Sequence, residues 1–172
     1  MIRLYITRMP AALPLQEGRA ASSQAAYALL SFAMQERGSD PAVLTLCRTS
    51  EGKPYFAGHE AEFSLSHSGE WVVCALSDAP VGVDVERIRS VSERLWGRFL
   101  AISPDEPYGG DWEAILRWTR YEAALKREGK KAPIDPDRCT TLDCIEGYLL
   151  TVCGDGEVSP VQWVEYERLL IP

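Results

Sequence analysis

Two carboxylates, Asp84 and Glu86, flank a single valine in the run Gly82-Val83-Asp84-Val85-Glu86. The β-branched valines predict a strand, and residues two apart on a strand point to the same face. Carboxylates held side by side repel each other unless a positive group lies between them. Mg²⁺, which prefers oxygen ligands, is the natural candidate for that group. Two solvated carboxylates on the polar face of a strand would give the same pattern.

Two further polar segments lie on either side of this pair. Upstream is Phe63-Ser64-Leu65-Ser66-His67-Ser68-Gly69, and downstream is a segment of helical character that contains Trp118, Glu122 and Lys126. Residues four apart share one face of a helix, so this segment can present a carboxylate and an ammonium together. An ordinary exposed Glu–Lys pair, worth a few tenths of a kcal/mol, is the alternative interpretation.

In this order the three segments resemble the motifs of the 4′-phosphopantetheinyl transferases of the surfactin-synthetase-activating type. The resemblance covers roughly residues 50 to 160. It implies an enzyme, a holo-[acyl-carrier-protein] synthase, that transfers the 4′-phosphopantetheine of coenzyme A to a serine of an apo acyl- or peptidyl-carrier protein. The reaction would depend on Mg²⁺ and release 3′,5′-ADP.

The resemblance also implies roles for individual residues. Asp84, Glu86 and Glu122 would hold Mg²⁺. Glu122, Lys126 and His67 would be the catalytic residues, with the glutamate as a candidate base. The residues expected to contact coenzyme A are Lys53, Pro54, Ser66, His67, Lys126 and Arg19.

Three features depart from the family pattern or weaken it. Tyr121 stands where relatives usually carry a basic residue, and the segment before the first predicted helix lacks the extra basic residues that hold the 3′-phosphate in longer relatives. Residues 52–55, Gly-Lys-Pro-Tyr, match a segment that lines adenine but are also an ordinary turn. A non-catalytic coenzyme A or carrier-protein binding module on the same scaffold is therefore the alternative function. A Mg²⁺-dependent phosphohydrolase is a third possibility without specific support.

The elements that must position these residues follow from local patterns. Apolar residues at helical spacing predict helices over 16–37 and 111–128. Alternating apolar runs separated by turn residues predict two β-hairpins, over 71–86 and 148–166. Residues 1–8 predict a first strand.

Each predicted hairpin follows a predicted helix, so the chain reads as two similar halves. We predict an α+β fold of two pseudo-symmetric subdomains, each with an antiparallel sheet packed against a long helix. Residues 1–88 would carry the coenzyme A contacts and the metal strand, and residues 89–172 the helix with the glutamate and lysine. The active site would lie in the cleft between them, as clefts between subdomains often do.

The composition is that of an ordinary globular protein, with 46% hydrophobic and 25% charged residues in a chain of 172. A net charge of −7 argues against nucleic-acid binding, and no apolar run reaches the ~20 residues of a membrane span. Ten of the 18 basic residues fall within 87–98 and 117–131, which suits an acidic carrier protein. A salt-bridged, solvated helix surface is the alternative.

Five cysteines without C-x-x-C spacing, and only two histidines, argue against a zinc site and predict a reducing, cytoplasmic setting. Cys74 and Cys153 lie in apolar runs, where a cysteine behaves as a small hydrophobe. We expect a monomer whose partners are coenzyme A and a carrier protein, with no membrane contact.

Overall fold

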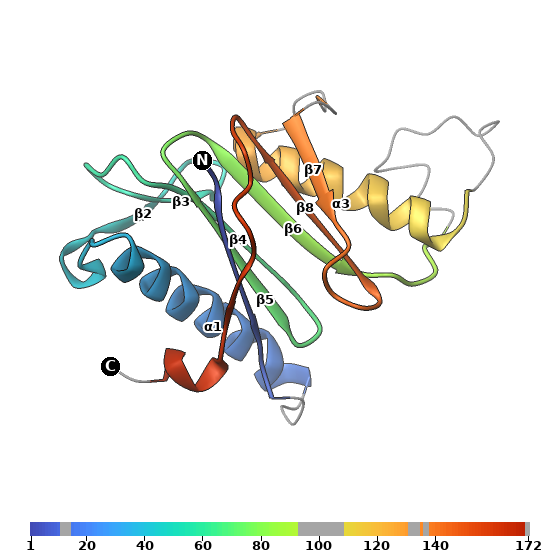
Figure 1. Ribbon diagram of the computed structural model, residues 1–172, viewed down its shortest axis with the longest axis horizontal. Helices are drawn as coiled ribbons and strands as arrows, with labels where there is room; N and C mark the ends of the chain where they lie inside the picture. Colours follow the sequence, from blue (N-terminus) through green and yellow to red (C-terminus); the bar gives the residue numbers. More distant parts are fainter. Residues whose placement is uncertain (11–14, 93–108, 131–134, 136–137, 171–172) are drawn as a thin grey trace.

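The structure is a computed structural model that describes residues 1–10, 15–92, 109–130, 135 and 138–170, with the backbone alone for 15–19. Two long helices, α1 (Leu15–Glu36) and α3 (Asp111–Glu128), lie on opposite sides of the strands (Figure 1). Both agree with the predicted helices to within one residue. The expected mixture of helices and sheets is confirmed. No helix of the described part is long and apolar enough to cross a membrane.

The strands form two larger sheets and one short hairpin. The first sheet has the order β4-β5-β1-β9, the second has the order β6-β8-β7, and β2 pairs only with β3. All described pairs are antiparallel except β1 with β9. The strands are β1 (Arg3–Arg8), β2 (Leu46–Arg48), β3 (Pro54–Phe56), β4 (Glu62–Ser68), β5 (Trp71–Ser77), β6 (Val81–Arg87), β7 (Cys139–Leu142), β8 (Tyr148–Gly154) and β9 (Gln162–Val164). Short 3₁₀ helices cover Pro41–Val43 and Tyr166–Leu169.

The first sheet is buried on both faces. One face packs on α1 through a core that includes Tyr5 and Leu29. The other face packs against the second sheet through a core that includes Leu4, Val83 and Val152. Helix α3 contacts β6 and β8 of the second sheet. Because side chains alternate along a strand, the valines of β6 face the first sheet, and Gly82, Asp84 and Glu86 face α3.

The two predicted β-hairpins are wrong, although their strands exist. Strands β5 and β6 follow each other in the chain, yet β5 lies between β4 and β1 while β6 pairs with β8. Strands β8 and β9 separate in the same way, because β9 pairs with β1. In the second sheet, β6 can bury its valines against the first sheet and still receive α3 on its other face. Alternation and turn residues are local signals, and they do not reveal that two consecutive strands join different sheets.

The sheets also cross the predicted boundary at residue 88. Strand β6 precedes that residue but pairs with β8 beyond it, and β9 returns from the end of the chain to the first sheet. The division into 1–88 and 89–172, and the pseudo-symmetry of the two halves, stay predictions.

The two sheets meet at β4 and β6 through side chains. Backbone N–H groups at every second residue of β6 donate to serine hydroxyls of β4: Val83 to Ser64 at 3.0 Å, Val85 to Ser66 at 3.3 Å and Arg87 to Ser68 at 3.3 Å. We call these three contacts the serine ladder. These contacts give hydrogen-bond partners to backbone N–H groups on the edge of β6 that does not pair with β8. They also fix the position of β6 along β4.

Cys139 and Cys153 are opposite residues of β7 and β8 and form a disulfide. This corrects the expectation that Cys153 is only a small hydrophobe, although its buried side chain does pack with Ala123 and Ala124 of α3. The two cysteines are 14 residues apart. Only the strand register brings them together, and the spacing alone does not reveal it.

Helix α3 passes directly over Gly82. A Cβ atom at this position would lie 1.8 Å from the carbonyl oxygen of Ala123 and 2.5 Å from the backbone nitrogen of Arg127. We therefore expect Gly82→Ala to lower the free energy of unfolding by about 3 kcal/mol or more, because backbone of α3 must move. Urea unfolding followed by circular dichroism measures this loss.

Gly154→Ala is the matched control, because Gly154 lies on the neighbouring strand opposite Val81. Its Cβ would first meet a terminal methyl group of Ile2 at 2.8 Å, and a side chain end can shift. We expect a loss of about 1 kcal/mol. Equal losses for the two variants would contradict the close approach of α3 to Gly82.

Candidate active site

The alternation of β6 brings Asp84 to the side of α3, where it meets Lys126. Asp84 is only 4% exposed. The ammonium of Lys126 donates to Asp84 Oδ1 at 2.7 Å and to the carbonyl oxygen of Val83 at 3.1 Å. The second carboxylate oxygen, Asp84 Oδ2, is buried and has no hydrogen-bond partner among the described residues.

Glu86 and Glu122 belong to the same electrostatic group. Burial raises the pKa of each carboxyl above its ordinary value of 4.5, and the negative charge of Asp84 raises both further. Lys126 acts in the opposite direction on both, and the hydroxyl of Ser68 also lowers the pKa of Glu86. Three carboxylates from β6 and α3 therefore repel one another across a half-buried site.

The donor chemistry of this group fits a hard cation such as Mg²⁺, because Asp84 Oδ2 is an unpartnered buried oxygen and the carboxylates repel. Within the described ranges, however, no three His, Cys, Asp or Glu residues are arranged to hold a metal ion. Lys126 occupies the other oxygen of Asp84. A site formed by all three carboxylates would thus require side chains such as Lys126 and Glu122 to move.

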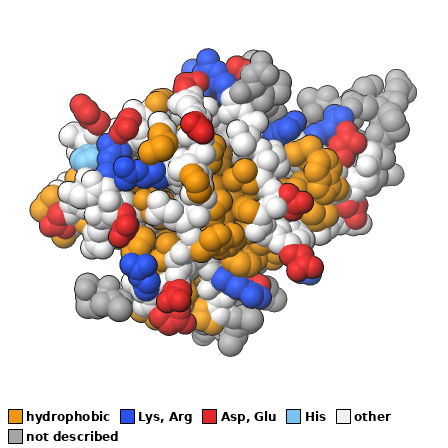
Figure 2. All heavy atoms as spheres, in the orientation of Figure 1, with side chains coloured by type: hydrophobic (Ala, Val, Ile, Leu, Met, Phe, Trp, Pro, Cys, Tyr) orange, Lys and Arg blue, Asp and Glu red, His pale blue; other side chains and the backbone are white. Residues whose placement is uncertain are grey.

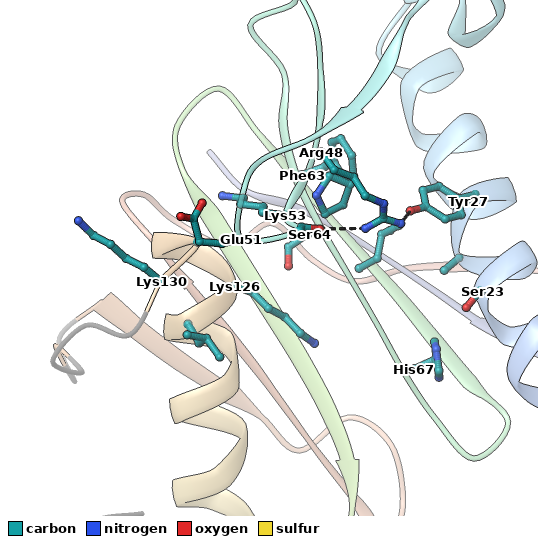
Figure 3. Close-up of a pocket in the computed structure, with 16 residues that line it drawn as sticks. Ser23, Tyr27, Arg48, Glu51, Lys53, Phe63, Ser64, His67, Lys126 and Lys130 are labelled. Carbon is teal, nitrogen blue, oxygen red and sulfur yellow. Dashed lines mark hydrogen bonds between the residues drawn. The ribbon is translucent and has the colours of Figure 1, made fainter. Parts of the chain in front are cut away.

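A cavity of about 660 Å³ lies beside the carboxylates. Its wall is built from α1, the β2–β3 hairpin, β4 and the last turn of α3, so it joins elements from distant parts of the chain (Figure 3). Small-molecule sites commonly have volumes of about 300–1,000 Å³. The charged side chains that line it are Arg48, Glu51, Lys53, Lys126 and Lys130, and the imidazole of His67 lines it as well.

Four residues predicted to bind coenzyme A or catalyse its reaction line this cavity: Lys53, Pro54, His67 and Lys126. His67 is exposed and comes from β4. The predicted metal ligands are not part of the wall, but Lys126 joins the cavity to Asp84. The side chain of Arg19 lies outside the described part of the chain, so its predicted contact stays a prediction.

Lys53 bridges the β2–β3 hairpin and the end of α3. Its ammonium donates to the carbonyl oxygen of Arg127 at 3.0 Å and pairs with Glu62 at 3.4 Å. The last carbonyls of a helix lack partners within the helix, and a lysine is a favourable one. Its side chain is 17% exposed. A bound anion in this cavity would therefore meet the Lys53 ammonium while that group also contacts Arg127 and Glu62.

Ser66 lies among the carboxylates and is 6% exposed. Its hydroxyl donates to Asp84 Oδ1 at 2.8 Å and accepts from Val85 N at 3.3 Å and Lys126 Nζ at 3.1 Å. A hydroxyl has one donor and two acceptor sites, so these three contacts use its full capacity. The predicted phosphate contact of Ser66 would have to displace one of them.

Sequence reasoning missed Arg48 and Tyr27. The guanidinium of Arg48 donates to Tyr27 Oη at 2.8 Å and to the carbonyl oxygen of Gly52 at 2.9 Å, which holds it against the wall (Figure 3). A basic residue at the end of one hairpin strand, four positions before the turn glycine, is the signal that could have indicated Arg48. Nothing local in the sequence pairs it with Tyr27 on α1.

The site therefore combines a cavity rich in cationic side chains with a group of carboxylates at one end. Such an arrangement binds a polyanion in the cavity and can place a cation beside it. This is the chemistry of a protein that handles a phosphorylated ligand.

Comparison with known proteins gives a consistent result, although no family model matches the chain. It is 30% identical over 172 residues to a 4′-phosphopantetheinyl transferase of Bacillus subtilis, with 77% of this chain and 74% of that protein covered. It is 35% identical over 140 residues to the 4′-phosphopantetheinyl transferase AcpT of Escherichia coli K12, with 67% and 70% covered. It is 28% identical over 143 residues to the 4′-phosphopantetheinyl transferase Sfp of Bacillus subtilis 168, with 64% and 63% covered.

The chain belongs to the 4′-phosphopantetheinyl transferase family, as the sequence motifs predict. The match spans less than two thirds of the length of Sfp.

Proposed function

We propose that this chain transfers 4′-phosphopantetheine from coenzyme A to a serine of an apo acyl- or peptidyl-carrier protein. The serine oxygen would form a bond to the phosphorus that carries the pantetheine arm, and the bond from that phosphorus to 3′,5′-ADP would break. The observation that carries this proposal is the cationic cavity that ends at Lys126, whose ammonium contacts the buried carboxylate of Asp84.

In this proposal Asp84, Glu86 and Glu122 hold Mg²⁺, which would neutralise charge on the pyrophosphate. Glu122 also accepts the proton of the attacking serine. A carboxyl with a raised pKa suits that role, because proton transfer is most efficient when the pKa of the base approaches the working pH. Lys126 and His67 contact the phosphates from the cavity wall.

Arg48 and Lys53 belong to the β2–β3 hairpin, whereas Lys126 of α3 contacts the carboxylate of Asp84, so we assign the hairpin end of the cavity to the nucleotide. Arg48 then provides a positive charge for the 3′-phosphate. Its contacts with Tyr27 and Gly52 orient the guanidinium in advance.

We expect Arg48→Ala to raise the KM for coenzyme A by about 10-fold or more, with kcat nearly unchanged, because a charged hydrogen bond is lost. Steady-state kinetics with coenzyme A and with 3′-dephospho-coenzyme A measures the effect. The variant should not change the KM for the second substrate, which lacks the 3′-phosphate. Equal increases for both substrates would place Arg48 elsewhere on the nucleotide.

The proposed partner is a small acidic carrier protein. Several basic side chains of α3 are already paired: Arg117 with Glu113, and Arg127 with Glu128 and Asp155. On the face seen in Figure 2, lysine and arginine side chains alternate with acidic ones and form no single large basic area. Among the described residues this face therefore gives no support for a continuous basic stripe, and residues 93–98 and 131 of the two predicted basic stretches lie outside the described part of the chain.

We also propose that a single chain suffices, because one chain supplies both the cavity and the carboxylates. For the compartment we propose the cytoplasm, on the cysteine pattern of the sequence. The Cys139–Cys153 disulfide does not itself support this choice, because disulfides are rare in a reducing compartment.

Release of 3′,5′-ADP from coenzyme A, measured by chromatography with and without an apo carrier protein, tests the proposal. A transferase releases 3′,5′-ADP only when both Mg²⁺ and the apo carrier are present. Release without carrier would instead indicate a phosphohydrolase. Tight coenzyme A binding without release of 3′,5′-ADP, observed with several apo carriers, would favour the binding module.

A further inference from the structure

The serine ladder does more than join the two sheets, because two of its three hydroxyls also reach a carboxylate. Ser66 donates to Asp84 Oδ1 at 2.8 Å, and Ser68 donates to Glu86 Oε2 at 3.1 Å. The first rung, Ser64, accepts from the backbone N–H of Val83, and no carboxylate contact of its hydroxyl is recorded among the described residues.

The spacing of the two strands explains this pattern. Residues 64, 66 and 68 of β4 face the edge of β6, where they meet the N–H groups of residues 83, 85 and 87. Each of those N–H groups follows a residue of β6 that faces α3. The hydroxyl that accepts from Val85 can therefore donate to Asp84, and the hydroxyl that accepts from Arg87 can donate to Glu86.

From this geometry we propose that Ser66 and Ser68 are positioning residues for the carboxylates of Asp84 and Glu86. Each serine is anchored to the backbone of β6 and fixes one carboxylate oxygen, which in Asp84 leaves the other oxygen without a partner among the described residues. The proposal rests on the proposed function, since it assigns these orientations to Mg²⁺ binding. It replaces the phosphate contact expected for Ser66.

Ser66 carries the larger effect. Its hydroxyl is buried and makes contacts with Asp84, Val85 and Lys126. It holds Asp84 Oδ1 while leaving Asp84 Oδ2 without a partner among the described residues. A serine here therefore separates the two oxygens of one carboxylate: one is fixed by the protein, and the other is free to accept a cation.

Mn²⁺ binding to the metal-free protein, followed by the decrease of the free Mn²⁺ signal in electron paramagnetic resonance, tests this inference without a carrier or coenzyme A. We expect Ser66→Ala to weaken Mn²⁺ binding by about 10- to 100-fold, the usual effect of losing a residue that orients a metal ligand. Ser68→Ala should weaken it less. Ser66→Thr, which keeps the hydroxyl, should restore most of the affinity.

Ser64→Ala is the matched control, because it removes the same ladder contact to β6 and leaves the carboxylates untouched. Its affinity for Mn²⁺ should stay within about 2-fold of the wild type, which is well below the effect expected for an orienting residue. If Ser66→Ala fails to fold, Ser66→Cys, which keeps the volume but donates only weakly, takes its place.

Equal Mn²⁺ affinities for the Ser64→Ala and Ser66→Ala proteins would overturn the positioning role. Wild-type protein that binds no Mn²⁺ would also overturn it. A Ser66→Ala protein that binds Mn²⁺ normally but coenzyme A poorly would overturn it as well, and would instead support the predicted contact of Ser66 with a phosphate of coenzyme A. The proposed function fails separately, when wild-type protein releases no 3′,5′-ADP in the presence of an apo carrier.

Discussion

Asp84→Asn is expected to lower the rate of phosphopantetheine transfer by about 10³-fold or more, the scale of losing a preorganised electrostatic group. The substitution keeps the shape of the side chain and an oxygen that can accept from Lys126, but it removes the charge. It also converts the buried, unpartnered Asp84 Oδ2 into an amide nitrogen or leaves a neutral oxygen there, and either binds Mg²⁺ more weakly than a carboxylate oxygen does. Single-turnover kinetics with coenzyme A and an apo carrier measures the loss.

Asp155→Asn is the matched control. Asp155 pairs with Arg127 at the end of α3 and is half exposed, so its loss weakens an ion pair of the same helix away from the carboxylates. Its transfer rate should stay within about 2-fold of the wild type, because exposed ion pairs contribute little. If both variants lose activity equally, the placement of the metal at Asp84 is wrong.

Glu122→Gln is expected to abolish transfer and yet to stabilise the metal-free protein at neutral pH. The pKa of Glu122 is raised above 4.5 by burial and by the charge of Asp84, so the folded protein binds this proton more tightly than the unfolded chain. Stability from this group is present below about pH 4.5 and is lost as the pH rises through the folded pKa. A glutamine removes that loss.

The melting temperatures of the wild type and of Glu122→Gln, measured from pH 4 to pH 8 in the presence of a chelator, show whether the substitution stabilises the protein. The melting temperature of Glu122→Gln should equal that of the wild type near pH 4 and exceed it by about 2 °C or more at pH 7. The difference should appear as the pH rises through the raised pKa of Glu122. Glu113→Gln is the control on the same helix, where the carboxylate pairs with Arg117 and no gain is expected. A glutamine variant that is less stable than wild type at pH 7 would contradict the repulsion among the carboxylates.

The grouping of the acidic side chains with Lys126 was predictable from the sequence because much of it is local. Asp84 and Glu86 share a face by strand alternation, and Glu122 and Lys126 share a face by helical spacing. The helices themselves follow from apolar periodicity and agree with α1 and α3 to within one residue.

The pairing of the strands was not predictable in the same way. The predicted hairpins failed because alternation identifies a strand but not its neighbour, and both β6 and β9 leave the strand that precedes them in the chain. The disulfide between Cys139 and Cys153 was not predictable for the same reason, because it depends on the register of β7 and β8.

The three serines of the Ser-Leu-Ser-His-Ser segment illustrate the difference most clearly. The family resemblance implies that Ser66 and His67 both contact coenzyme A, and His67 does line the cavity. In the structure Ser66 faces the opposite way, toward β6, because successive residues of a strand point to opposite faces. In a segment that forms a strand, the roles implied by a family motif must therefore be assigned residue by residue.

The intact mass of an apo carrier protein, measured after incubation with this protein and coenzyme A in the presence of Mg²⁺, tests the central claim most directly. The account predicts that the carrier gains the mass of one phosphopantetheine on a serine, and that a chelator or the Asp84→Asn substitution prevents the gain. A carrier of unchanged mass, with protein that is folded and binds coenzyme A, would contradict it.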